Sequence, residues 1–382
     1  MPFTIKMLPL AAAIAFAFAG AASAAEEQIV KIGHVAPISG PIAHLGKDME
    51  NAGKMAIEDL NAKGLTIGGK KIKFELLAED DAGDPRQGTT VAQKLVDAKV
   101  NGVVGHLNSG VTIPASKIYF DAGIPQISPA STSPKYTQQG FNTAFRVVAN
   151  DSQLGGALGR YAVKTLKAKN VAVIDDRTAY GQGVADEFMK AAKAAGANIA
   201  AQQFTNDKAT DFNAILTSIK SKKPDVIFFG GMDAVGGPMM RQMKQLGIQA
   251  KFMGGDGICT ESLAKLASDA IGENQVICAE AGGVADANKK PIDDFRAAYK
   301  KKFGIEVQLY APYVYDSVNV MVAAMQKADS VEPAKYLPEL AKIHYKGITG
   351  PIIFDEKGDI KDGSLTLFTY KGGKRALVAV IK

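Results

Sequence analysis

The stretch GHLNSGVTIPAS, residues 105–116, follows a short apolar run and leads into a segment with helical apolar spacing. A second polar stretch, SPASTSP at residues 128–134, follows the next apolar run. In an open α/β sheet, ligands bind outside the carboxyl ends of strands. Asn108, Ser109 and Gly110 lie where the next helix is expected to begin, so its unpaired N–H groups suit a small carboxylate. The alternative is that the hydroxyls of both stretches only cap helices and turns.

Short apolar runs alternate with amphipathic segments along most of the chain. One such series runs from Gln28 to Val148, and a second with the same rhythm begins at Gln153. This alternation predicts parallel sheets with helices on both faces. A chain of 382 residues is also too long for one simple core and comfortable for two domains. The last apolar runs, near residues 364–370 and 376–381, are too few for a domain and should join an existing sheet.

Residues 1–24 have the pattern of a secretory signal peptide. A charged start that includes Lys6 precedes an apolar run, residues 8–19, and small residues then lead to an Ala-x-Ala site. The apolar run is too short to span a bilayer. We therefore expect cleavage after Ala24 and export of a soluble mature protein; a buried first helix is the alternative.

Composition and charge are those of an ordinary globular protein. Hydrophobic residues make up 47% of the chain and charged residues 22%, as is usual for an α/β protein. The net charge is +6, but the lysines are scattered along predicted helices, which indicates solvated faces and no nucleic-acid partner. The two cysteines, Cys259 and Cys278, are expected to form a disulfide in an exported protein, with two buried thiols as the alternative.

The residue patterns of common enzymes and metal sites are missing from the sequence. None of the four histidines has metal-site spacing, and no Gly-x-Ser-x-Gly elbow occurs. Glycine clusters at 230–237 and 254–257 lack the order of a dinucleotide-binding loop. Asp80, Asp81 and Asp84 lack the spacing of a calcium loop, so a turn with an Asp cap is expected. No enzyme activity, metal or cofactor is predicted; polar loops at strand ends of two similar lobes are typical of a cleft-type receptor.

Seven motifs, in order, give the chain a family likeness. It resembles the periplasmic leucine/isoleucine/valine-binding proteins, the soluble receptors of branched-chain amino-acid ABC importers. Each motif is weak alone, but the set covers essentially the whole mature chain. The motifs are ISGPIA at 38–43, DDAGDP at 80–85, GHLNS at 105–109, SPAST at 128–132, YGQG at 180–183, GG at 230–231 and FDEKGD at 354–359.

The resemblance implies the type I periplasmic-binding-protein fold. That fold has two doubly wound parallel-sheet lobes, joined by a hinge of three chain crossings, with the ligand enclosed between them. By position, residues 25–148 and 283–354 would form the N-terminal lobe, and residues 149–282 and 355–382 the C-terminal lobe.

The resemblance also implies the ligand contacts. The two loops of the first lobe would hold the α-carboxylate and α-ammonium of an amino acid through Leu107, Asn108, Ser109, Ala130, Ser131 and Thr132. In the second lobe Asp256, beside Gly257, would pair with the ammonium. The tyrosine of the family's Tyr-Gly-x-Gly motif is Tyr180 here. A zwitterion removed from water needs donors at one end and acceptors at the other, and these residue types supply both.

Several positions depart from the family pattern. The acidic position often carries Glu, and Asp256 is one methylene shorter. Two pocket positions that are often aromatic are Leu45 and Met232 here, which makes the wall more aliphatic and adaptable. The cysteine pair of the family's first lobe is replaced by Gly83 and Asn108, so that disulfide is missing.

The sequence therefore predicts a monomeric, non-enzymatic periplasmic receptor for an aliphatic, branched-chain L-amino acid. It would deliver this ligand to an inner-membrane ABC permease. A receptor of the same fold for an amide or urea is one alternative, but an uncharged ligand would leave the buried Asp256 carboxylate unpaired. A sensory ligand-binding module, which would need a separate partner, is the other.

Overall fold

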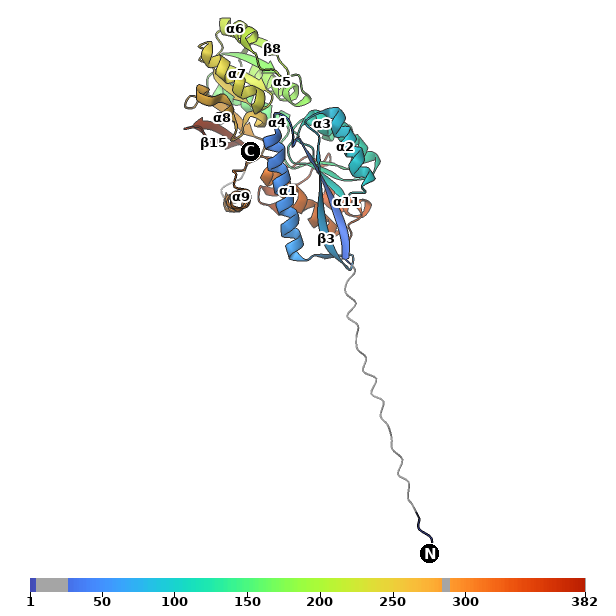
Figure 1. Cartoon of the computed structure of the whole chain (residues 1–382). Coiled ribbons are helices and arrows are strands. Elements are labelled where there is room, and N and C mark those ends of the chain that lie inside the picture. Colours follow the sequence, from blue (N-terminus) through green and yellow to red (C-terminus); the bar gives the residue numbers. More distant parts are fainter. Residues whose placement is uncertain (5–26, 284–288, 382) are drawn as a thin grey trace.

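The structure, a computed structural model, describes residues 1–4, 27–283 and 289–381. Most of the predicted signal peptide and its cleavage site lie outside these residues. Figure 1 shows two bodies, each built around a sheet: α1, α2, α3 and α11 surround one, α5 to α8 the other, and α4 lies at the junction.

The first sheet has six strands in the order β2-β3-β1-β4-β5-β6. All neighbours run parallel except β2 and β3, which a two-glycine turn at Gly68 and Gly69 joins as an antiparallel pair. The strands are β1 (Glu27–Ala36), β2 (Thr66–Ile67), β3 (Lys70–Asp80), β4 (Gly102–Gly105), β5 (Gln126–Ser128) and β6 (Ala144–Arg146).

The second sheet has seven strands in the order β15-β14-β11-β10-β9-β7-β8. As predicted, the last two strands join a sheet that the middle of the chain has already built. The prediction of purely parallel sheets is wrong at this edge, because a turn at Gly372 and Gly373 folds β15 back on β14. The strands are β7 (Asn170–Asp175), β8 (Asn198–Phe204), β9 (Val226–Gly230), β10 (Lys251–Gly254), β11 (Val276–Glu280), β14 (Leu365–Lys371) and β15 (Lys374–Ile381).

Helices cover both faces of each sheet, as the alternating pattern predicts. Around the first sheet they are α1 (Ala43–Lys63), α2 (Pro85–Asp97), α3 (Ser109–Asp121), α9 (Lys289–Phe303), α10 (Ala311–Lys327) and α11 (Pro333–Ala341). Around the second they are α4 (Asp151–Lys164), α5 (Ala179–Ala194), α6 (Asn213–Ser221), α7 (Asp233–Gln245) and α8 (Leu263–Ala267). A small antiparallel hairpin, β12 (His344–Gly347) and β13 (Gly350–Ile353), lies outside both large sheets.

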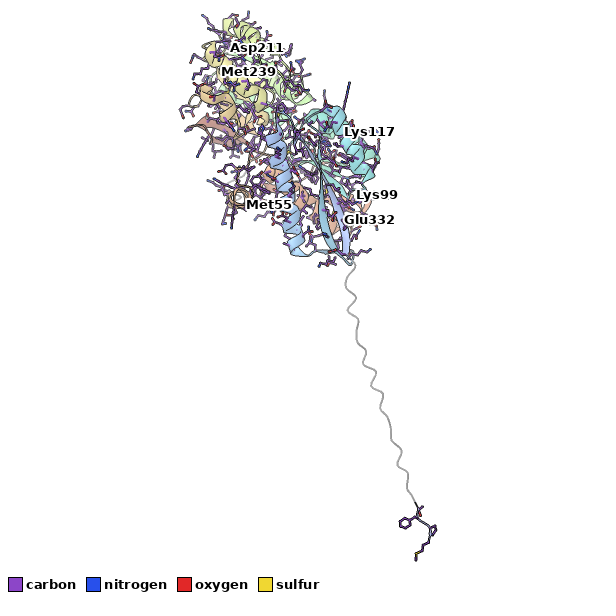
Figure 2. All side chains as sticks on the ribbon, viewed as in Figure 1. Met55, Lys99, Lys117, Asp211, Met239 and Glu332 are labelled. Atoms are coloured by element: carbon purple, nitrogen blue, oxygen red, sulfur yellow. A yellow bond between two sulfur atoms is a disulfide. The ribbon has the colours of Figure 1, made fainter. Side chains whose placement is uncertain are left out.

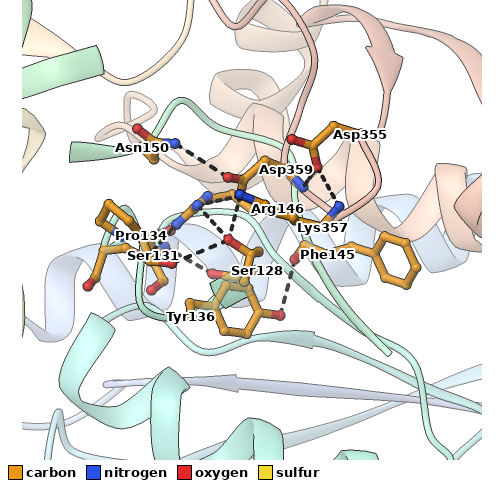
Figure 3. A network of polar contacts seen from close by, with 12 residues as sticks. Ser128, Ser131, Pro134, Tyr136, Phe145, Arg146, Asn150, Asp355, Lys357 and Asp359 are labelled. Carbon is orange, nitrogen blue, oxygen red and sulfur yellow. Dashed lines mark hydrogen bonds and ion pairs between the residues drawn. The ribbon is translucent and has the colours of Figure 1, made fainter. Parts of the chain in front are cut away.

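The chain passes between the two sheets three times: after β6, after β11 and after β13. An ion pair with a fully buried arginine connects two of these crossings. The fully buried Arg146, at the end of β6, pairs with Asp359 on the third crossing, and Asp359 also accepts a hydrogen bond from Asn150 on the first (3.3 Å; Figure 3). The first crossing bonds to the second through the N–H of Ala149 and the carbonyl of Ala281 (2.8 Å).

Two local predictions about side chains are also confirmed. Asp84 caps α2 by accepting hydrogen bonds from the N–H groups of Arg86 (2.8 Å) and Gln87 (3.0 Å). Cys259 and Cys278 form a disulfide that fastens the loop after β10 to β11. A closed loop of this size stabilises a fold by roughly 3 kcal/mol in the chain-entropy model.

The lysines are dispersed over the surface. Lys99 and Lys117, for example, are exposed at separate places on the body of the first sheet (Figure 2). Exposed lysines on separate elements are typical of a solvated surface.

Candidate functional site

The two polar loops of the first sheet meet at the carboxyl ends of adjacent strands. β4 and β5 pair in parallel, so the chain leaves both at the same edge. The hydroxyl of Ser131 donates to the Ser109 hydroxyl (3.2 Å), and the N–H of Ser133 donates to the same oxygen (3.2 Å). α3 begins at Ser109, as predicted, and Asn108 is its N-cap without a side-chain capping bond. Ser109 therefore connects the two loops, whereas the capping alternative predicted a bond within its own helix.

A small pocket lies between the two bodies at this edge. Four of its lining residues come from the body of the first sheet before Arg146, three from the other body, and one from the segment before α10. They are Leu107, Asn108, Ser109, Ala130, Tyr180, Met232, Asp256 and Tyr310. The structure thus brings together seven of the residues proposed from the sequence.

The other proposed residues lie outside this lining. Gly257 donates its N–H to the Tyr180 hydroxyl (2.9 Å), and so helps to orient the tyrosine. Ser131 and Thr132 are buried, and the Ser131 hydroxyl contacts the lining residue Ser109. Leu45 is fully buried in the hydrophobic core and is not among the lining residues.

Asp256 is the acidic centre of the pocket. Its carboxylate accepts one hydrogen bond from the hydroxyl of Tyr180 (2.8 Å) and one from that of Tyr310 (2.9 Å), a residue on the opposite body. Burial raises the pKa of Asp256 to about 6, and the tyrosine hydrogen bonds oppose this rise because they stabilise the ionised form. The group is therefore ionised at neutral pH.

A second carboxyl group, that of Asp151, lies nearby at the start of α4. It is fully buried, and neither oxygen has a hydrogen-bond partner among the described residues. Burial raises its pKa to about 8, and the charge of Asp256 adds to the rise. Its backbone N–H donates to the carbonyl of Thr132 (2.8 Å), so the group is fixed beside the second loop.

The two carboxyl groups have no direct bond to a basic side chain, although the charge of Arg146 lowers the pKa of Asp151. Within residues 27–283 and 289–381, no lysine or arginine side chain donates a hydrogen bond to Asp151 or Asp256. At the other end of the pocket are the Ser109 hydroxyl and the first N–H groups of α3, which favour an anion. The pocket is thus complementary to a ligand with an ammonium at one end and a carboxylate at the other.

Sequence reasoning missed Tyr310 and Asp151. Tyr310 is held by Asp48 of α1, whose carboxylate accepts hydrogen bonds from the N–H groups of Leu309 (3.2 Å) and Ala311 (3.0 Å). No motif marks that long-range contact. Asp151 follows the N-cap Asn150, so in the sequence it looks like an ordinary acidic residue of a first helical turn.

Two further hydrogen bonds join the bodies outside the pocket. His44 at the start of α1 bonds to Asp233 at the start of α7 (2.8 Å), which also accepts from the Thr260 hydroxyl (2.6 Å). The Ser262 hydroxyl donates to the Gln308 side chain (2.7 Å). These bonds hold the two bodies together along one side of the cleft.

An outer chamber of about 520 Å³ adjoins the pocket between the same two bodies. It shares Asn108, Tyr180 and Met232 with the pocket lining, so the two spaces meet at these side chains. The chamber lining is mostly apolar on the side of the first body, where Pro41, Ile42 and other residues contribute to it.

Comparison with known proteins agrees with this two-body architecture. A model of the periplasmic binding protein family matches residues 29–374. The chain belongs to this family. A Leu/Ile/Val-binding protein homolog of Brucella abortus is 36% identical over 372 residues, which cover 95% of both chains. The leucine-, isoleucine-, valine-, threonine- and alanine-binding protein of Pseudomonas aeruginosa is 34% identical and covers 96% of both.

Solved structures of periplasmic binding proteins have the same fold as this chain. A leucine-binding protein from Thermotoga maritima superimposes with a TM-score of 0.84 at 27% identity, over 92% of this chain and 99% of that one. A branched-chain amino-acid transporter binding protein from Streptococcus pneumoniae, solved with isoleucine, gives 0.82 at 27% identity, over 93% and 99%. The predicted fold class, two α/β lobes of the type I periplasmic-binding-protein fold, is confirmed.

Among residues 1–4, 27–283 and 289–381, no helix is both long and apolar enough to cross a bilayer.

Proposed function

We propose that this protein is a periplasmic receptor that captures a branched-chain L-amino acid between its two lobes and delivers it to an ABC permease. One observation carries the proposal: a buried, ionised Asp256 without a basic partner faces the Ser109 hydroxyl and the N-terminus of α3 across one small pocket. The α-ammonium of an amino acid would neutralise Asp256. Its α-carboxylate would accept hydrogen bonds from the Ser109 hydroxyl and from the N–H groups at the start of α3. The proteins it resembles, which bind leucine, isoleucine or valine, support this ligand class.

In this proposal the ligand-binding residues are Leu107, Asn108, Ser109, Ala130, Ser131, Thr132, Tyr180, Met232, Asp256 and Gly257, together with Tyr310 and Asp151. Leu45 acts only through the core behind the pocket. Residues 25–148 and 283–354 form one lobe, and residues 149–282 and 355–382 the other. The protein is a monomer without enzymatic activity.

A receptor for an uncharged amide or urea is the rival within the same fold. Such a ligand would leave the carboxylate of Asp256 without a cation in a buried site. Calorimetric titration of ligand-stripped protein distinguishes an amino-acid receptor from a receptor for an amide or urea. We expect L-leucine, L-isoleucine and L-valine to bind, and acetamide and urea to give no heat; the reverse pattern would overturn the proposal.

The pH dependence of binding follows from the pKa of Asp256. The ammonium binds the ionised carboxylate, and the pKa of about 6 means that the ionised fraction falls from most of the protein at pH 7 to a small part at pH 5. Affinity for L-leucine should therefore fall about tenfold between pH 7 and pH 5, since neither ligand group titrates there. Calorimetry across this range checks the slope, and Asp256→Asn should flatten it.

The bond between His44 and Asp233 should favour lobe closure. It joins the two lobes without touching the pocket, so it stabilises the closed form and raises the apparent affinity. His44→Ala should weaken binding of L-leucine by roughly 1 kcal/mol, about fivefold. His344→Ala, at an exposed residue of β12, is the matched control and should change nothing. Equal affinities for both variants would remove His44 from the closure mechanism.

A further inference from the structure

Lysines occur on all parts of the surface, but the fold concentrates them at one end of the second sheet. β7 to β11 run parallel, so the chain enters these strands at the end opposite the pocket. The β14–β15 turn lies there too, because the N–H of Gly372 donates to Glu273, just before β11 (2.9 Å). This end, the amino end of the second sheet, consists of residues 164–170, 193–198, 220–225, 244–251, 268–275 and 371–374.

The amino end of the second sheet is strongly basic. Its segments contain eleven lysines and three carboxylates, those of Asp225, Asp269 and Glu273. The excess of positive charge is therefore larger than the net charge of the whole chain, which is +6. All of these lysines are exposed except the half-buried Lys251. In the sequence they are far apart and look scattered, and only the fold shows that they form one basic surface.

The protein itself neutralises little of this charge. Within residues 27–283 and 289–381, Lys244 is the only one of these lysines in an ion pair, with Asp269 (2.7 Å). The Asp225 carboxylate instead accepts hydrogen bonds from the backbone N–H groups of Lys169 (2.7 Å) and Asn170 (2.9 Å). The basic surface is thus left to an anionic partner.

Helix ends explain only part of the excess. Four of the lysines lie in the last turns of α4, α5, α6 and α7, where a cation is favourable beside the helix C-terminus. The other seven lie in connections and in the β14–β15 hairpin. The corresponding end of the first sheet is nearly balanced, with four lysines and three carboxylates in residues 27–28, 63–71, 97–101, 121–125 and 140–143.

The shape of the basic surface suits a partner whose negative charge is spread over an area. Seven strands about 4.8 Å apart make it roughly 30 Å wide, which is wider than one small anion. A groove of about 580 Å³ with Lys220, Lys223 and Pro224 in its lining can receive a headgroup. Each lysine close to an anionic lipid surface strengthens binding roughly fivefold.

We propose that the amino end of the second sheet binds the surface of an anionic phospholipid membrane. The pocket lies at the opposite ends of the same strands, so the cleft stays free while this surface is occupied. The inference does not depend on which ligand the pocket binds.

The test is sedimentation of the protein with vesicles of phosphatidylcholine alone or mixed equally with phosphatidylglycerol. We expect at least tenfold stronger binding to the mixed vesicles at low salt, and a steep decrease as salt screens the charges. Replacing Lys220, Lys222 and Lys223 together with glutamine should weaken this binding at least tenfold.

The matched control removes the same charge from the first lobe. Lys63, Lys71 and Lys99 are also exposed, and their joint replacement with glutamine should change vesicle binding less than twofold. Both triple variants should bind L-leucine like the wild type.

Three results would overturn the proposal. One is equal binding of the wild type to both kinds of vesicle, and another is an equal loss of binding in the two triple variants, which would show attraction by net charge alone. The third is binding of soluble polyglutamate without binding of mixed vesicles, which would point to an acidic polymer as the partner. Lys167→Gln combined with Lys169→Gln provides the same measurement if the first triple variant does not fold.

Discussion

Replacing Asp256 with asparagine should weaken the binding of L-leucine by roughly 2–5 kcal/mol, the usual loss when one partner of a buried charge pair is removed. The amide keeps the size of the side chain and can still accept a hydrogen bond from a tyrosine hydroxyl. What it loses is the charge that balances the ligand's ammonium. At 1.4 kcal/mol per factor of ten, the dissociation constant rises at least about 25-fold, which calorimetry measures easily.

The same Asp256→Asn substitution should leave the stability of the ligand-free protein unchanged or raise it. Asp256 is buried and its pKa is raised, so its ionised form costs folding free energy that the neutral amide does not. Asp256→Asn should therefore melt at the same temperature as the wild type or higher. Asp269→Asn, which removes a carboxylate from an exposed ion pair with Lys244 in the same lobe, is the control and should bind normally. Normal binding by Asp256→Asn would remove this residue from the site.

Replacing Arg146 with methionine should destabilise the folded protein by about 3–5 kcal/mol. Its guanidinium is fully buried, pairs with Asp359 and donates to the carbonyls of Ser131 (3.1 Å) and Ser133 (2.8 Å; Figure 3). Methionine has a similar length but donates no hydrogen bond, so Asp359 loses its cation and the loop carbonyls lose their donor. Urea unfolding followed by circular dichroism measures the loss.

The matched control is Lys117→Met. Lys117 also pairs with an aspartate, Asp121 (2.5 Å), but the two side chains are 56% and 54% exposed, so the loss should stay below about 1 kcal/mol. Similar losses in the two variants would show that the buried pair does not stabilise the region where the crossings meet. Arg146→Met should also bind L-leucine more weakly, because it no longer holds the loop behind Ser109.

Much of this architecture is predictable because it follows from local sequence. The polar stretch after β4 places the start of α3 at Ser109, and Asp84 is recognisable as a cap because a proline follows it directly. Alternating strand and helix patterns predict two parallel sheets with covered faces. The disulfide is expected from two cysteines in a chain whose first residues have the pattern of an export signal.

The features that the sequence does not predict depend on contacts between distant segments of the chain. Tyr310 reaches Asp256 because Asp48, far away in the sequence, binds the N–H groups of Leu309 and Ala311 on either side of the tyrosine. The antiparallel pair at the edge of each sheet depends on a two-glycine turn. The pattern of apolar residues does not show how such a turn changes the strand order. The resemblance implies Leu45 as a pocket residue, and the structure places this side chain in the hydrophobic core.

The central claim is that the two lobes close around a ligand that contacts both of them. Ser109 belongs to one lobe and Asp256 to the other, so a ligand bound by both favours the closed form by its differential affinity. Small-angle X-ray scattering of ligand-stripped protein, with and without saturating L-leucine, tests this directly. We predict a smaller radius of gyration with the ligand. If calorimetry shows binding while the two scattering curves superimpose, closure of the lobes is contradicted.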